Sequence, residues 1–174
     1  MLFRSIDATQ HDAFLLDSLE KAVREVHIVS PWIRQQRMKD SGILSAMAEA
    51  ALRGVSITVY ADRELNLDRG GDANQEAEGN WLDAMTVFAD AGITLVDIPR
   101  LHSKIVIRDN VALCVGSFNW LSASRRGRYV RHETSITYTG PRVGQEIGTI
   151  LRSLASRVET IPFSGMDTLR QFQG

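Results

Sequence analysis

Short β-branched runs alternate along this chain with amphipathic segments that end near a glycine, and this alternation restricts the fold more than any other feature. Residues 26–30, Val-His-Ile-Val-Ser, form one such run, which Pro31 closes. Apolar residues then recur at helical spacing over residues 43–52, and Gly54 follows at a place that suits a helix end. Strands separated by helices favour a largely parallel sheet with helices on both faces. The pattern therefore predicts an α/β fold.

The same pattern along the chain predicts six strands and four helices in one domain, residues 1–174, with a core over about residues 10–158. The strands are expected at residues 26–30, 55–60, 93–96, 103–108, 111–115 and 134–138, and the helices from an N-cap at Thr9 to Val23 and at residues 43–52, 81–91 and 143–158. Asp109-Asn110 tolerates the positive φ of a tight hairpin, so an antiparallel pair makes the sheet mixed. Residues 63–80 and 121–132 are expected to be long loops.

The formal net charge of −1 conceals an uneven distribution of charge. Residues 62–97 hold nine acidic and two basic residues, whereas residues 100–132 hold seven lysines or arginines and one aspartate, a local charge of +6. The net charge of −1 disfavours a nucleic-acid binder that is held by overall charge, so any site for a polyanion must be a local cluster.

Cysteine content and hydropathy restrict the class of protein further. Cys114 is the single cysteine, which excludes an intrachain disulfide and a zinc site of several cysteines. No apolar stretch approaches the length of about 18 residues that a membrane span needs, and the first residues turn polar too early for a secretion signal. We expect a cytoplasmic protein with no membrane partner, either whole or as a domain of a larger chain.

A basic pair lies where one of the predicted strands begins. His102 and Lys104 are two residues apart, so on a strand they point to one face. The lysine is a compact positive charge suited to phosphate, and the imidazole titrates near neutrality and can act as nucleophile or general acid. The alternative is a solvent-facing pair on an edge strand.

Three polar residues farther along the chain could complete such a site. Ser117 and Asn119 follow Gly116 after the next strand, with the same two-residue spacing, and could donate hydrogen bonds to phosphate oxygens. Glu133 begins the last strand and could orient a histidine. The alternatives are a capped strand-to-helix turn for the first two residues and a surface ion pair for Glu133.

The spacing His102-x-Lys104-x-x-x-x-Asp109, followed after six residues by Gly116-Ser117-x-Asn119, resembles the signature of the phospholipase D superfamily. Residues 26–32 resemble the first core strand of that family. Residues 50–55 resemble the segment that leads from a helix into its second core strand. Together the resemblance covers roughly residues 10–140 and implies the family's fold.

The resemblance also implies roles for the catalytic residues. His102 attacks phosphorus and forms a phosphohistidine. Lys104 and Asn119 hold the phosphoryl oxygens, and Ser117 assists them. Asp109 is mainly a structural hydrogen-bonding residue, and Glu133 orients the histidine. No metal and no other cofactor is expected, because lysine and polar donors stabilise the charge.

The family's chemistry needs two histidines, whereas this chain has one complete motif. His11 is expected to be exposed on the first helix, His27 to be packed within a strand, and His132 to lie beside the site. A single-motif chain resembles the short bacterial members, which form homodimers with one shared site. Two-fold symmetry brings the same residue of both chains together.

The leading functional hypothesis is a metal-independent nuclease acting on DNA or RNA. The cluster Arg125, Arg126, Arg128 and Arg131 suits contacts with successive phosphates, and Trp120 and Tyr129 could stack on unpaired bases. A solvated or partner-binding loop is the alternative for this cluster. A lipid phosphodiesterase or transphosphatidylase is a second hypothesis, and a nucleic-acid-binding module of a helicase, restriction or defence protein is a third.

Overall fold

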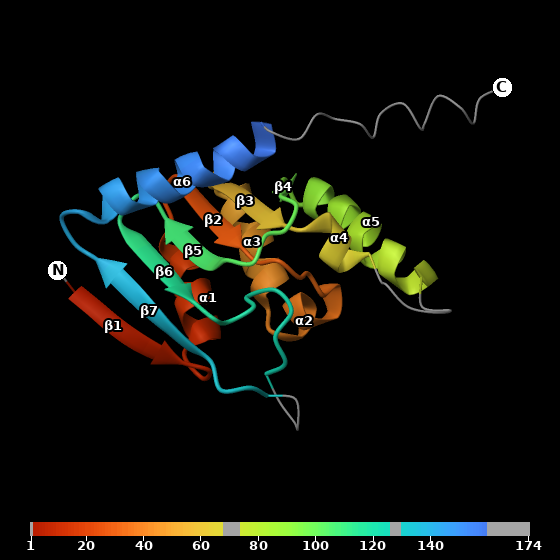
Figure 1. The fold of residues 1–174 in the computed structure, drawn as a ribbon, viewed down its shortest axis with the longest axis horizontal. Helices are drawn as coiled ribbons and strands as arrows, with labels where there is room; N and C mark the ends of the chain where they lie inside the picture. The colour runs from red at the N-terminus through yellow and green to blue at the C-terminus, as the bar shows by residue number, and fades with distance from the viewer. Residues whose placement is uncertain (1, 68–73, 126–129, 160–174) are drawn as a thin grey trace.

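The computed structural model describes residues 2–67, 74–125 and 130–159. Within these ranges the protein forms a seven-stranded sheet in the order β1-β7-β6-β5-β2-β3-β4. The strands are β1 (Leu2–Asp7), β2 (Glu25–Val29), β3 (Ser56–Ala61), β4 (Thr94–Asp97), β5 (Lys104–Arg108), β6 (Ala112–Gly116) and β7 (Thr134–Thr139). The helices are α1 (His11–Lys21), α2 (Gln35–Asp40), α3 (Ile43–Leu52), α4 (Arg63–Asn66), α5 (Asn74–Asp90) and α6 (Val143–Glu159). Figure 1 shows their arrangement.

The sheet is mixed, as predicted, but the prediction that it is largely parallel is wrong. Only β2–β3 and β3–β4 are parallel among the described pairings, and the other four pairings are antiparallel. A parallel return needs a crossover of a dozen or more residues. The link from Asp97 to Lys104 is shorter and contains no helix, so β5 starts near the end of the sheet where β4 finished and runs against β2.

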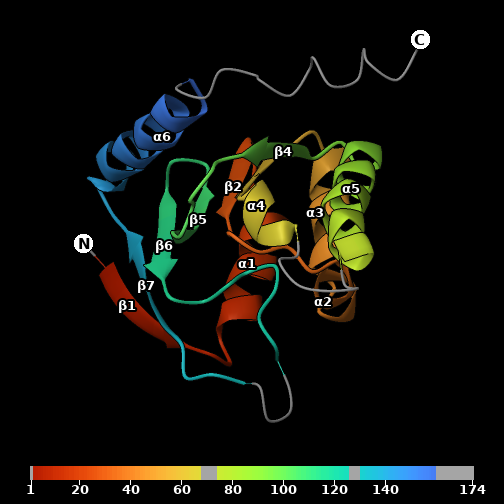
Figure 2. The ribbon, with the colours of Figure 1, turned by 45° about the vertical axis from the view of Figure 1, so that its right-hand side comes forward.

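Helices cover both faces of the sheet, as predicted (Figure 2). One face packs against Leu15 and Leu19 of α1, Met47 of α3 and Phe88 of α5 in the larger core. The other face packs against α6 in a second cluster, which includes Val143, Ile147 and Leu154 of that helix. No helix of the described ranges is both long enough and apolar enough to cross a membrane.

Several elements differ from the sequence-based expectation. β1 and α2 lack clear patterns and were not expected, and the segment 63–80 is not one loop, because α4 and the start of α5 lie in it. Thr9 does not cap α1. Its hydroxyl donates to Asp7 at 2.7 Å, and the helix begins at His11 after Gln10. The β5–β6 hairpin is confirmed, with positive φ at Asp109 and Asn110.

Candidate active site

The predicted site residues meet because three strands begin or end at the same end of the sheet. Lys104 at the start of β5 pairs with Gly116 at the end of β6, and Gly116 pairs with Ser135 of β7. His102 precedes β5, while Ser117 and Asn119 follow β6 and Glu133 precedes β7. Residues more than 30 positions apart are therefore collected in the loops at one end of the sheet.

His102 and Lys104 form the centre of this site. The Nζ atom of Lys104 lies 3.2 Å from Nε2 of His102 and donates to its carbonyl oxygen at 2.6 Å. His102 is exposed, but Lys104 is only 6% exposed, and β5 lies between β6 and β2. The alternative of a solvent-facing pair on an edge strand is therefore excluded. Burial lowers the pKa of Lys104, and the carboxylate of Glu133 opposes this shift.

Ser117 and Glu133 bind each other across the loops that flank the site. The Ser117 hydroxyl donates to Oε2 of Glu133, and the Thr134 amide donates to the Ser117 hydroxyl at 3.3 Å. Among the described residues no hydrogen bond joins Glu133 to His102, so its role in orienting the histidine stays a prediction. In the described structure Glu133 accepts a hydrogen bond from Ser117, and its negative charge acts to raise the pKa of Lys104.

Asn119 has an unsatisfied polar atom. Its Oδ1 atom is buried and has no hydrogen-bond partner within the described part of the chain. Most buried polar atoms in native proteins are hydrogen-bonded, and the exceptions concentrate where a ligand or a catalytic role explains them. Oδ1 is an acceptor and would take a donor group of a ligand, whereas a phosphoryl oxygen would be bound by the Nδ2 donor of the same amide, so the predicted contact of Asn119 with a phosphoryl oxygen stays a prediction.

Asp109 lies at the far end of β5 and does not reach the site. Its carboxylate accepts hydrogen bonds from the backbone amides of Val23, Arg24 and Glu25 at 2.9, 2.7 and 2.9 Å. Burial raises the pKa of Asp109, but these amides outweigh it and the net shift is downward. Its contacts agree with the structural role that the resemblance implies.

Gly116 is required where β6 meets β7. A Cβ atom at this position would overlap the side chain and backbone of Ser135. The Ser135 hydroxyl also hydrogen-bonds Nε2 of His11 at 2.7 Å. The glycine before Ser117 therefore serves the packing of two strands behind the site.

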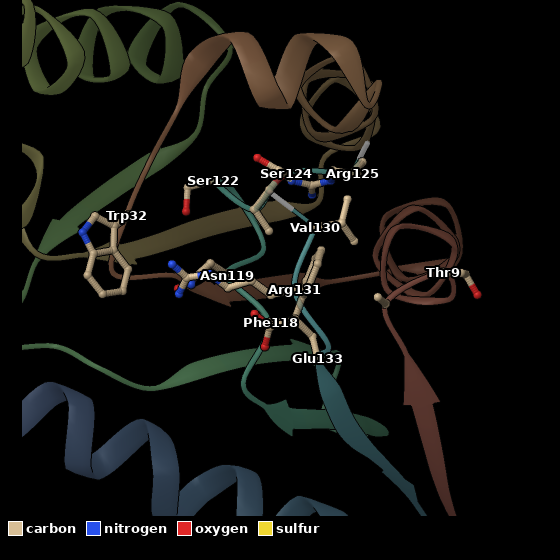
Figure 3. Close-up of a pocket in the computed structure, with 12 residues that line it drawn as sticks. Thr9, Trp32, Phe118, Asn119, Ser122, Ser124, Arg125, Val130, Arg131 and Glu133 are labelled. Carbon is tan, nitrogen blue, oxygen red and sulfur yellow. Dashed lines mark hydrogen bonds between the residues drawn. The ribbon is translucent and has the colours of Figure 1, made fainter. Parts of the chain in front are cut away.

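A cavity of about 650 Å³ opens beside these residues. Its lining includes Trp32, Asn119, Arg125, Arg131 and Glu133. Figure 3 shows Trp32 and Thr9 at opposite sides of the view, with Asn119, Phe118 and Glu133 between them. The cavity therefore presents an aromatic ring, an amide, a carboxylate and arginine side chains next to the His102–Lys104 pair.

A family model described as "Cardiolipin synthase, PLD-like domain" matches residues 15–154, most of the chain. The chain belongs to the phospholipase D-like family. Members of this family are phosphodiester-processing enzymes. None of the curated proteins compared with the chain matches it.

Solved structures of phospholipase D-like proteins share the fold. Nuc from Salmonella typhimurium, a phospholipase D family member, has a TM-score of 0.66 and 18% identity, over 90% of this chain and 95% of Nuc. NucT from Helicobacter pylori has a TM-score of 0.61 and 12% identity, over 90% of this chain and 98% of NucT. The phosphatidylserine synthase of Haemophilus influenzae Rd KW20 has a TM-score of 0.62 and 12% identity, over 86% of this chain and 36% of the synthase.

The structure changes the predicted substrate-binding set of this phospholipase D-like domain. Trp120 is 0% exposed, so the prediction that it stacks on a base is wrong. Arg125 binds Asp12 through two nitrogens at 2.8 and 2.9 Å and lies over the ring of Phe118, so its charge is already paired. Only Arg131 of the predicted arginines is both described and exposed on the cavity. The predictions for Arg126, Arg128 and Tyr129 lie outside the described residues.

Two other side chains differ from the sequence-based reading. His11 is buried, contrary to prediction, and its ring stacks on Phe118 with centroids 4.1 Å apart. His27 is packed as expected, with Nδ1 at 3.2 Å from the Tyr60 hydroxyl. Trp32 was missed as a site residue. Its signal was a Pro-Trp pair directly after a buried strand, but only the β2–β5 pairing shows that this strand ends beside Lys104.

Proposed function

We propose that the protein is a nuclease that hydrolyses phosphodiester bonds in DNA or RNA through a phosphohistidine intermediate. The observation that carries this proposal is the exposed His102 with a buried lysine 3.2 Å from its Nε2 atom. The positive charge of Lys104 attracts a phosphate to this place, and the exposed imidazole of His102 can reach the phosphorus atom. The chain holds one such pair, so we further propose that a homodimer supplies the second histidine.

In the proposed first step a nitrogen of neutral His102 attacks phosphorus and the bond to the leaving oxygen breaks. The protonated His102 of the partner subunit gives its proton to that oxygen. In the second step water attacks the phosphohistidine, the N–P bond breaks and the water proton returns to His102 of the partner subunit. Lys104 and Asn119 hold the phosphoryl oxygens throughout, so the charge is stabilised without a metal ion.

Nucleic acid is favoured over lipid by the chemistry of the cavity. Its described lining mixes apolar residues with polar and cationic side chains, among them Asn119, Ser122 and Arg131, and these polar groups suit the sugars and phosphates of a nucleic acid. The chain also spans 95% of Nuc and 98% of NucT but only 36% of the phosphatidylserine synthase, in keeping with the short single-motif form.

The test is a cleavage panel on labelled DNA, RNA and phospholipid, with and without EDTA. We expect nucleic-acid cleavage that EDTA leaves intact. His102→Ala should lower the rate by roughly three orders of magnitude or more, because it removes the nucleophile and the acid together. His132→Ala, which removes an exposed histidine, is the matched control and should keep its activity.

Three outcomes would contradict the proposal. Cleavage of lipid without cleavage of nucleic acid would favour the transphosphatidylase hypothesis. Loss of activity in EDTA would remove the metal-free mechanism. A His102→Ala enzyme at the wild-type rate would show that the site lies elsewhere.

A further inference from the structure

Trp32 is an aromatic side chain placed directly against the proposed nucleophile. Its ring centroid lies 6.1 Å from that of His102, at an interplanar angle of 83°, and Nζ of Lys104 lies over the ring, 5.4 Å from the centroid. A group that stacks on the indole must therefore use the face opposite Lys104. The side chain is half-buried and lines the 650 Å³ cavity. Trp32 therefore borders both the reacting centre and the space that a substrate would occupy.

Within the described part of the chain, the other aromatic residues near the site do not present a ring to a substrate. Trp120 is completely buried, and Phe118 is buried between the ring of His11 and the guanidinium of Arg125. Among the described residues of the cavity lining, Trp32 is the aromatic one that retains exposed surface.

The backbone that carries Trp32 is fixed by buried polar contacts. Asn66, which is 2% exposed, accepts from the Ile33 amide at 2.8 Å and donates to the Pro31 carbonyl at 2.8 Å. The Ser30 hydroxyl donates to the Trp32 carbonyl at 3.1 Å. Both chain neighbours, Pro31 and Ile33, are buried. The backbone from which the indole projects is thus fixed before substrate arrives, which lowers the entropic cost of binding a planar group.

We propose that Trp32 forms a base-binding subsite, on which the unpaired base of a nucleotide adjoining the scissile phosphate stacks. The inference rests on the proposed nuclease function and deepens it. A base is joined to its phosphate through a single sugar, so a ring beside His102 lies within reach of the base when phosphorus is at the imidazole. Stacking on one aromatic face does not depend on base identity but requires an unpaired base. The enzyme should therefore prefer single-stranded to double-stranded substrate.

The test compares two substrates that differ only in the presence of bases. One is a single-stranded oligothymidylate, and the other is an oligonucleotide of equal length built wholly from abasic tetrahydrofuran units. For each, kcat/KM is measured with wild type, Trp32→Leu and Trp32→Phe. Phe3→Leu is the control, since Phe3 is an exposed aromatic residue of β1 outside the described cavity lining.

Wild type should cleave the thymidylate strand roughly ten-fold or more faster than the abasic strand. Trp32→Leu should lose most of this advantage, because its rate should fall several-fold more on the thymidylate strand than on the abasic strand. Trp32→Phe should retain most of the advantage, because a smaller aromatic face remains, and Phe3→Leu should match wild type.

An equal loss on both strands would overturn the inference, because Trp32 would then act only by positioning His102 or Lys104. Unchanged rates in Trp32→Leu would overturn it as well. In both cases wild type still cleaves DNA and the proposed function survives. A wild-type protein that cleaves neither DNA nor RNA would instead refute the proposed function, and the inference with it.

Discussion

Lys104 and Asp109 lie at opposite ends of β5 and have different roles. Lys104 lies in the candidate site, whereas Asp109 makes structural hydrogen bonds. Asp109 ties the end of β5 to the start of β2 through three backbone amides, and its own amide donates to the Glu25 carbonyl at 3.0 Å. This contact sets the register in which Val29 pairs with Ile105. That register in turn brings Lys104 beside the chain segment that holds Trp32.

Asp109→Asn should destabilise the protein by about 1–3 kcal/mol at neutral pH, because an amide cannot accept all three hydrogen bonds. Asparagine tolerates the positive φ of this position, so backbone strain does not contribute. The pKa of Asp109 is below 3.8 in the folded state, so its stabilisation is present above about pH 4 and is lost as the pH falls through the folded-state pKa. Urea unfolding at pH 7 and pH 3 checks this. A difference that stays constant down to pH 3 would contradict it.

At the scale of elements, local patterns were sufficient for the β5–β6 hairpin and for the helices that end near a glycine. The hairpin depends on two adjacent turn residues, and Gly54 takes a positive φ of 88° after α3. Contacts between distant segments were not predictable in the same way. β1 forms because β7 offers an unpaired edge, and α1 packs so that His11 faces Phe118 rather than solvent. The helical pattern alone could not distinguish the buried from the exposed histidine.

In the candidate site too, residues close together in the sequence were predictable, and residues brought together by tertiary packing were not. The spacing of His102, Lys104, Ser117 and Asn119 could be read from the sequence because all four flank one hairpin. The substrate-contacting surface could not, because it depends on which aromatic and basic side chains the tertiary packing leaves open. Trp120 looked available and is buried, whereas Trp32 lies in the segment after β2, 70 residues before His102.

The α1 helix should make stability sensitive to mild acid through His11. Burial lowers the pKa of His11 below 6.5. The unfolded chain then binds a proton that the folded chain does not, so stability is complete above about pH 6.5 and falls as the pH drops toward the folded-state pKa. In His11→Gln the melting temperature should decline less between pH 7.5 and pH 5 than in wild type. His132→Gln, at an exposed histidine, should follow wild type, and parallel declines in all three proteins would contradict the assignment.

At the scale of the whole molecule, one chain carries half of the proposed chemistry, so the working unit should be a pair. Sedimentation should give a particle of about twice 19.4 kDa. If wild type and His102→Ala chains are co-expressed in equal amounts and pair at random, only about one quarter of the dimers hold two histidines. Activity per total chain should then be about one quarter of the pure wild-type value. A value of one half would show that each chain works alone.

The close approach of Gly116 to Ser135 has a consequence for how sequences of this kind are compared. Any side chain at position 116 would collide with a serine whose hydroxyl is bound to a buried histidine. The glycine is therefore required by the packing of the sheet, whatever reaction the site carries out. A chain of this fold without His102 and Lys104 would have the same steric need for a glycine at position 116 if it contained Ser135. Whether such a chain could carry out phosphodiester chemistry is better judged from Ser117 and Asn119, which follow the glycine, and from His102 and Lys104, which lie at the start of β5.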